Sequence, residues 1–196
     1  MTIIYLIRHG NTDYTHKRIS GYIPGVHLNE TGCRQAEKIA DFLQENLIKA
    51  IFASPLERTM ETAAPLAQRL NLTVTPAEAL KEINFGELQG LGEELITLPV
   101  WEQFNAHPAE VAFPGGESIR EAQQRVVVCL NKLAENFSNE DQIACFAHCE
   151  ILRLAIAYAL HIPLDNYMRL TIDPASITCL DWKPENGIAI SININV

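Results

Sequence analysis

Ile3-Ile4-Tyr5-Leu6-Ile7-Arg8-His9-Gly10, near the start of the chain, is the stretch that decides the fold. Its first five residues are apolar and rich in β-branched side chains, so they predict a short buried strand. The strand ends on Arg8, His9 and Gly10, which bring a permanent cation, a titratable ring and a permissive backbone to one point. In an open α/β sheet, ligands bind at the carboxyl ends of the strands. This strand end is therefore a candidate anion-binding site.

Length, composition and charge limit the class of protein. The chain has 196 residues, 47% of them hydrophobic, so we expect a single domain over residues 1–196 with a sizeable core. The net charge of −9 comes from 15 basic and 24 acidic residues without a long basic run, which argues against nucleic acid as a partner. No apolar stretch approaches the roughly 18 residues of a membrane span, and the N-terminus lacks the pattern of a signal peptide.

Cysteine usage indicates the compartment. The odd number of cysteines and their scatter through apolar segments indicate reduced thiols, so we expect a cytoplasmic protein. Cys145, His148 and Cys149 lie close enough in sequence to suggest a metal site. However, their spacing fits no common zinc pattern, and strand alternation points Cys145 away from His148. We therefore expect neither a metal nor another cofactor.

Strand and helix patterns alternate along the chain, which predicts a three-layer α/β/α sandwich with a mainly parallel sheet. The predicted helices cover residues 31–46, 54–70, 118–136 and 151–160, with one short helix near Trp101. The further predicted strands cover residues 50–53, 72–74, 142–147, 176–182 and 188–194. Residues 84–116 are irregular, with Gly and Pro punctuation, and we expect them to form a lid-like insertion.

Two helix starts have clear capping signals. Ser54-Pro55-Leu56-Glu57 predicts a helix with Ser54 as N-cap, Pro55 at the first position and Glu57 closing a capping box. Ser118-Ile119-Arg120-Glu121 predicts a second capping box at the start of the 118–136 helix.

Four chemically active side chains follow different predicted strands. Arg58 lies one turn into the helix after the second strand, Glu82 follows the third strand, and His148 follows the fourth as His9 follows the first. In a parallel sheet these ends share one edge, so the side chains converge. Paired guanidinium groups match a phosphoryl group, a neutral imidazole can attack phosphorus, and a carboxyl group can protonate a leaving oxygen.

Five blocks in this order resemble the histidine phosphatase superfamily, which includes cofactor-dependent phosphoglycerate mutases. The resemblance covers nearly the whole chain and favours the phosphatase branch of this phosphoglycerate mutase-like fold. The blocks are Arg8-His9-Gly10-Asn11-Thr12, Ser54-Pro55-Leu56-Glu57-Arg58-Thr59-Met60-Glu61-Thr62-Ala63, Glu82-Ile83-Asn84-Phe85-Gly86-Glu87-Leu88-Gln89-Gly90, Pro114-Gly115-Gly116-Glu117-Ser118 and Phe146-Ala147-His148.

The resemblance implies a role for each catalytic candidate. His9 is expected to be the nucleophile that takes the phosphoryl group onto a ring nitrogen. Arg8, Arg58 and His148 are expected to hold the phosphoryl oxygens. Glu82 is expected to protonate the leaving alcohol and then to accept a proton from water. No metal is needed in this scheme, because the arginines supply the stabilising charge.

Several positions extend or depart from the family pattern. The family usually has Glu or Gln where this chain has Asn11, many members have Asn at Thr15, and Gly often follows the last histidine where Cys149 and Glu150 stand here. A side chain at 149 narrows the pocket, and Glu150 adds negative charge. The predicted phosphate-binding set is Arg8, Asn11, Thr15, Arg18, Gly21, Arg58, His148 and Cys149.

Some alternatives stay open from sequence. Glu87 is a rival to Glu82 for the acid. The favoured function is a histidine acid phosphatase-type phosphoric monoester hydrolase acting on a small phosphorylated metabolite. The rivals are a phosphomutase of the phosphoglycerate mutase type and a non-enzymatic phosphate-binding protein. Resembling mutases are commonly longer, with a tail that shields the phosphoenzyme, which favours hydrolysis here. Neither nucleic acid nor membrane is expected as a partner, and a homodimer is one candidate assembly.

Overall fold

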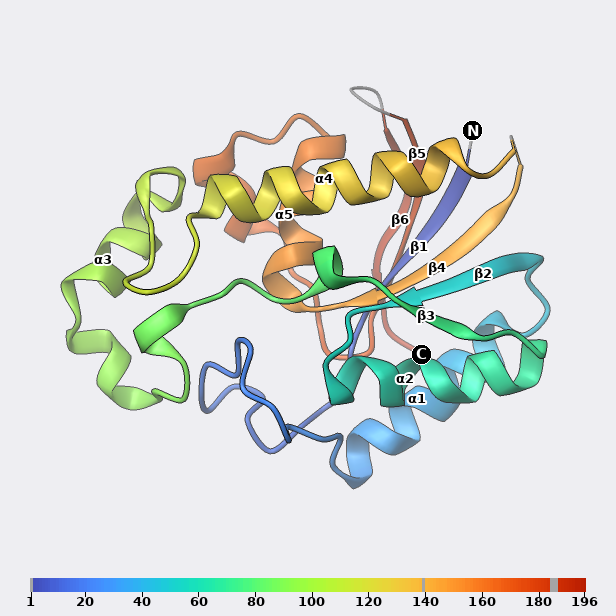
Figure 1. Cartoon of the computed structure of the whole chain (residues 1–196), viewed down its shortest axis with the longest axis horizontal. Coiled ribbons are helices and arrows are strands. Elements are labelled where there is room, and N and C mark those ends of the chain that lie inside the picture. Colours follow the sequence, from blue (N-terminus) through green and yellow to red (C-terminus); the bar gives the residue numbers. More distant parts are fainter. Residues whose placement is uncertain (1, 139, 184–186) are drawn as a thin grey trace.

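The central sheet positions the candidate site. The computed structural model describes residues 2–138, 140–183 and 187–196, and within them six strands form one sheet in the order β3-β2-β4-β1-β5-β6 (Figure 1). The four strands β3, β2, β4 and β1 are parallel, whereas β5 is antiparallel to β1 and β6 to β5. The sheet is therefore mainly parallel, as predicted. The strands are β1 (Thr2–Arg8), β2 (Ile48–Ala53), β3 (Val74–Pro76), β4 (Gln142–Ala147), β5 (Ile177–Trp182) and β6 (Ile188–Ile194).

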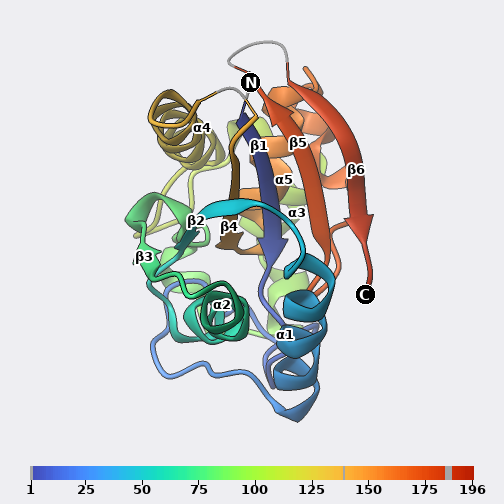
Figure 2. The same ribbon diagram turned by 90° about the vertical axis from the view of Figure 1, so that its right-hand side faces the viewer.

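Helices cover both faces of the sheet and confirm the three-layer prediction (Figures 1 and 2). Successive residues of β4 point to opposite faces: Phe146 joins the apolar cluster with α1 and α2, and Cys145 joins the cluster with α4 and α5. The α-helices are α1 (Glu30–Leu43), α2 (Glu57–Leu70), α3 (Pro99–Ala106), α4 (Ile119–Glu135) and α5 (Cys149–Ala159). The short 3-10 helices are η1 (Glu78–Leu80), η2 (Gly86–Leu88), η3 (Glu93–Thr97), η4 (Pro108–Glu110) and η5 (Leu164–Arg169).

Residues 84–116, the expected lid-like segment, extend from one end of the sheet and contain α3 and the short helices η2 to η4 (Figure 1). An aromatic cluster holds the segment together. The ring of Phe113 lies 4.8 Å from that of Phe85 and 5.3 Å from that of Phe104, and Trp101 lies 5.1 Å from Phe104. This cluster joins the two ends of the segment, because Phe85 lies three residues after Glu82 and Phe113 lies near the other end.

The predicted cap at Ser54 is wrong, whereas the one at Ser118 is confirmed. Helix α2 begins at Glu57, and the preceding Leu56 is extended with ψ 141° and provides no side-chain cap. The Ser54 hydroxyl lies 2.8 Å from Nε2 of His148 and accepts only a long bond (3.4 Å) from the Leu56 N–H, which precedes the helix. At α4, Ser118 and Glu121 form both bonds of a capping box.

Two further element boundaries differ from prediction, because residues expected elsewhere form the end of one helix and the start of another. The third strand begins at Val74 rather than at residue 72, because Asn71 is left-handed (φ 53°) and the Leu72 N–H closes α2 on the Ala67 carbonyl. Helix α5 begins at Cys149 rather than at residue 151, directly after His148. The backbone N–H groups at the start of α5 therefore lie at the edge where the candidate residues gather.

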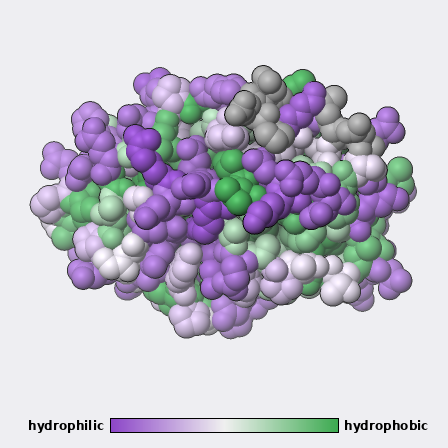
Figure 3. Space-filling view, turned by 45° about the horizontal axis from the view of Figure 1, so that its top comes forward, coloured by the Kyte–Doolittle hydropathy of each residue, from purple (hydrophilic) through white to green (hydrophobic). Residues whose placement is uncertain are grey.

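Hydrophilic side chains form much of the face that Figure 3 shows, and apolar side chains appear among them as separate patches. The large apolar clusters lie between the sheet and its helices. In the described residues, no helix is long and apolar enough to cross a membrane.

The loop after β1 packs tightly on the first turn of α1, and Gly32 permits that contact. A β-carbon on Gly32 would overlap the carbonyl oxygen of Asn11, which is backbone and cannot rotate away. We expect Gly32→Ala to lower the free energy of unfolding by about 1–3 kcal/mol, despite the better helix propensity of Ala. Urea denaturation measures the change, with Cys33→Ala, at the exposed neighbouring position, as control. A Gly32→Ala protein as stable as wild type would contradict this account.

Candidate active site

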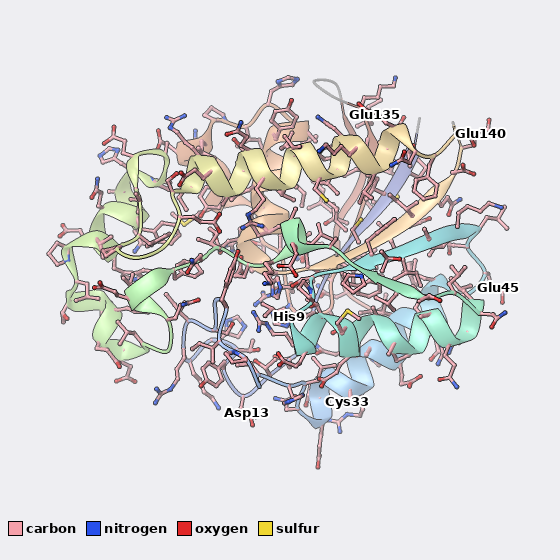
Figure 4. All side chains as sticks on the ribbon, viewed as in Figure 1. His9, Asp13, Cys33, Glu45, Glu135 and Glu140 are labelled. Carbon is pink, nitrogen blue, oxygen red and sulfur yellow. The ribbon has the colours of Figure 1, made fainter. Side chains whose placement is uncertain are left out.

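The parallel strands bring the predicted residues to one edge of the sheet. His9 follows β1, His148 follows β4 and precedes α5, and Arg58 lies in the first turn of α2 after β2. Glu82 follows β3 and η1. In Figure 4, His9 lies at this edge, beside the beginning of α2. The imidazole rings of His9 and His148 have centroids 5.2 Å apart and an interplanar angle of 62°.

His9 has the protonation state and orientation of a nucleophile. Its side chain is buried, and Nδ1 lies 2.7 Å from the carbonyl oxygen of Gly10, so Nδ1 carries the proton and Nε2 keeps its lone pair. Burial lowers the pKa of His9 well below its ordinary value, and the charges of Arg58 and Arg8 lower that pKa further. The ring is therefore neutral at pH 7.

The side chains of Arg58 and Arg8 have buried N–H donors that meet no acceptor in the described residues. Arg58 is fully buried and donates from Nη2 to the Gly21 carbonyl (2.8 Å), whereas its Nε and Nη1 have no hydrogen-bond partner in the described residues. Arg8 donates from Nη1 to the Ile172 carbonyl (2.7 Å), and its Nε is likewise buried without a partner there. Burial lowers the pKa of Arg58 to about 10, so it stays charged at neutral pH. Buried donors of this kind fit the oxygens of a phosphoryl group.

His148 is fully buried and lies between Ser54 and His9. Ser54 contacts its Nε2, and its Nδ1 has no partner in the described residues. Burial lowers the pKa of His148 well below its ordinary value, and the positive charge of Arg58 lowers that pKa further. When the Ser54 hydroxyl donates to Nε2, the neutral ring carries its proton on Nδ1 and supplies one more donor.

Glu82 is the carboxyl group nearest this cluster of donors. It is 8% exposed, and its Oε1 accepts from the N–H groups of Ile83 (3.0 Å) and Ile151 (3.3 Å). Burial is the largest influence on its pKa and Glu150 the second, and together they raise that pKa to about 7. A carboxyl group in this state holds a proton in a substantial fraction of molecules at neutral pH. The rival Glu87 is exposed and outside the cavity lining.

A cavity of about 170 Å³ lies beside His9, Arg8 and Glu82. Of the predicted residues, those in its lining are Arg8, His9, Thr15, Arg18, Gly21, Glu82 and Cys149. Arg58 and His148 are fully buried and do not line it. The charge of Arg58 lowers the pKa of His9, and the ring of His148 contacts the ring of His9. Asn11 also lies outside the lining, because its amide donates to Gln35 Oε1 (3.0 Å) on α1.

The residues that depart from the family pattern have specific contacts. The Thr15 hydroxyl accepts from the Thr12 N–H (2.9 Å), and Arg18 is exposed and donates to the Gly90 carbonyl (3.1 Å). Burial raises the pKa of the Cys149 thiol to about 12, with Glu150 as the next cause, so Cys149 stays protonated. Among the described residues, no three His, Cys, Asp or Glu side chains are grouped to hold a metal ion.

Sequence reasoning did not assign some of the cavity residues to the site. Tyr14, Ser20 and Phe85 line the cavity, as do Trp101 and Phe104 of α3. Apart from Phe85, which lies in the block of Glu82, these residues stand outside the five blocks. A second chamber of about 360 Å³ adjoins the cavity, and the two linings share His16, Arg18, Ile19 and Trp101.

The chain belongs to the histidine phosphatase superfamily, because a model of this family (branch 1) matches residues 4–195. Phosphoserine phosphatase 1 of Hydrogenobacter thermophilus is 26% identical over 198 residues, which cover 99% of this chain and 93% of that protein. A solved mycobacterial glucosyl-3-phosphoglycerate phosphatase is 27% identical with a TM-score of 0.87, covering 97% of this chain and 98% of its own. Phosphoserine phosphatase of Entamoeba histolytica, in complex with 3-phosphoglyceric acid, is 26% identical with a TM-score of 0.86, covering 99% and 98%.

These relatives confirm the resemblance found in the sequence, and their names support phosphatase activity in this chain. The names of these relatives specify different phosphate esters as substrates.

Proposed function

We propose that the protein is a metal-independent phosphomonoesterase of the histidine acid phosphatase type, acting on a small phosphorylated metabolite through a phosphohistidine on His9. One observation carries this proposal: a neutral buried imidazole lies beside unpaired arginine donors and a carboxyl group with a pKa of about 7. Nucleophile, anion-binding donors and proton donor are the parts that phosphoryl transfer needs.

In the first half of the proposed reaction, Nε2 of His9 attacks phosphorus and the bond from phosphorus to the ester oxygen breaks. Glu82 gives its proton to that oxygen, so the product leaves as a neutral alcohol. Arg8, Arg58 and His148 donate to the phosphoryl oxygens, where negative charge is spread in the transition state. In the second half, Glu82 takes a proton from water, the water oxygen bonds to phosphorus, and inorganic phosphate leaves His9.

Cavity size supports a small substrate. The cavity of about 170 Å³ and the adjoining chamber of about 360 Å³ together fall in the range of about 300–1,000 Å³ that is usual for small-molecule sites. The relatives named for phosphoserine and glucosyl-3-phosphoglycerate favour a polar metabolite over a macromolecule.

A phosphate-release screen over a panel of phosphomonoesters, run with a chelator present, tests the proposed function. We expect release of inorganic phosphate that does not depend on added metal. Isomerisation of 3-phosphoglycerate that needs a bisphosphorylated primer, with little phosphate release, would establish a mutase instead. Tight binding of inorganic phosphate with no turnover of any ester would establish a non-enzymatic phosphate-binding protein.

A further inference from the structure

Glu150 is a second carboxyl group in the wall of the catalytic cavity. It is the second residue of α5, and it lines the cavity together with Glu82. The backbone N–H of Glu150 donates to Oε2 of Glu82 (3.4 Å), and the next N–H, of Ile151, donates to Oε1 (3.3 Å). The first turn of α5 therefore holds one carboxyl group by its backbone and carries the other as a side chain.

An ion pair holds the side chain of Glu150 in the cavity wall. Its Oε1 accepts from Nη1 of Arg153 at 2.7 Å, and its position in the first turn places it in the positive field of the helix N-terminus. Cys149 and Tyr167 are the other titratable groups beside it, and burial holds the pKa of each well above its ordinary value, so both stay neutral. Among these side chains, Glu150 is the one whose charge raises the pKa of Glu82.

The groups that face Glu82 come from several elements. Arg58 on α2 opposes the proton on Glu82, because a cation stabilises the carboxylate. Arg125 on α4 donates to the Glu82 carbonyl (3.2 Å), but its charge is paired with Glu117 (2.6 Å). Tyr22, from the loop before α1, is uncharged at neutral pH, because burial raises its pKa. Besides burial, Glu150 is thus the group that favours the proton on Glu82.

We propose that Glu150 is a positioning residue that keeps Glu82 in its acid form between turnovers. The inference rests on the proposed function, in which Glu82 protonates the leaving oxygen. A negative charge beside a buried carboxyl group raises the pKa of that group, because a like charge disfavours the ionised form. Arg153 holds the side chain of Glu150 in the cavity wall, where its charge favours the proton on Glu82 before substrate binds.

The pH profile of kcat/KM reports this effect, since it reflects the ionisation of the free enzyme. Because the acid form of Glu82 is required, wild-type kcat/KM should fall as pH rises through the pKa of Glu82, about 7. Glu150→Gln removes the neighbouring charge and lowers that pKa. We therefore expect the falling limb to move to lower pH by about 0.5–1 unit, with kcat/KM about 3–10-fold below wild type at pH 8 and unchanged at pH 5.5.

A variant of opposite sign and a matched control complete the test. Arg153→Gln removes the cation that partly offsets the charge of Glu150, so the falling limb should move to higher pH, and a move to lower pH would overturn the proposal. Glu87→Gln neutralises an exposed carboxylate outside the cavity and should leave the limb in place. A Glu150→Gln limb at the wild-type pH, or a loss equal at every pH, would overturn the proposal.

A carbon-13 NMR titration of the Glu82 carboxyl group separates this proposal from the proposed function. If the protein releases no phosphate from any ester, the proposed function fails, but the pKa of Glu82 can still be compared between wild type and Glu150→Gln. A lower pKa in the variant supports the inference, and an unchanged pKa overturns it. If Glu150→Gln does not fold, the same titration is made on Arg153→Gln. A pKa of Glu82 above that of wild type then supports the inference, and a lower pKa overturns it.

Discussion

His9→Ala is expected to lower phosphate release from every ester by at least about 10³-fold, because it removes the atom that accepts the phosphoryl group. Two neighbouring side chains, Cys149 and His148, are poor replacements. Cys149 stays protonated through its raised pKa, and Nε2 of His148 is occupied by Ser54. Phosphate release from a good substrate, measured with excess enzyme and chelator, gives the change in rate.

A chemical trap checks the same prediction. Wild type incubated with a labelled phosphoryl donor and quenched in alkali should keep label on the protein, and acid should release it, because the nitrogen–phosphorus bond of phosphohistidine is acid-labile. His9→Ala should keep none, whereas His107→Ala, at an exposed histidine, should behave as wild type. Comparable label or turnover in His9→Ala would refute the nucleophile assignment.

The strand-end rule explains why much of the site could be predicted. Parallel strands end at one edge, so residues after strands 1, 2 and 4 meet even though they are far apart in sequence. His9, Arg58 and His148 are placed in this way, and the structure brings them and Glu82 to one cluster. Their catalytic roles stay predictions.

The sequence could not predict contacts between segments that lie far apart along the chain, because local patterns treat such segments as independent. Ser54 satisfies every local signal for an N-cap, yet its hydroxyl contacts His148, 94 residues away. Asn11 belongs to the first block, yet Gln35 on α1 takes its amide. Glu150 was predicted only as a nearby charge. Its place beside Glu82 depends on the contact between the first turn of α5 and a residue 68 positions earlier, which no local pattern indicates.

Glu82→Gln is expected to have an effect that depends on the leaving group. For an alkyl phosphate such as phosphoserine, kcat/KM should fall by about 10²–10⁴-fold, because an alkoxide leaves poorly without a proton. For p-nitrophenyl phosphate, whose phenolate leaves unaided, the fall should stay within about 10-fold. The amide of Gln keeps the size of the side chain but has no proton to transfer, so the substitution tests chemistry more than packing.

Glu87→Gln is the matched control, because Glu87 lies in the same block, is exposed and is outside the cavity lining. It should change neither substrate by more than about 2-fold, as expected for surface substitutions. A large, leaving-group-dependent loss in Glu87→Gln would move the acid role to that residue. An equal loss for both esters in Glu82→Gln would mean that Glu82 holds the cavity in shape and supplies no proton. The pH profile separates these outcomes further: if Glu82 is the acid, the residual alkyl phosphatase activity of Glu82→Gln should no longer fall through pH 7, since the group with that pKa is gone.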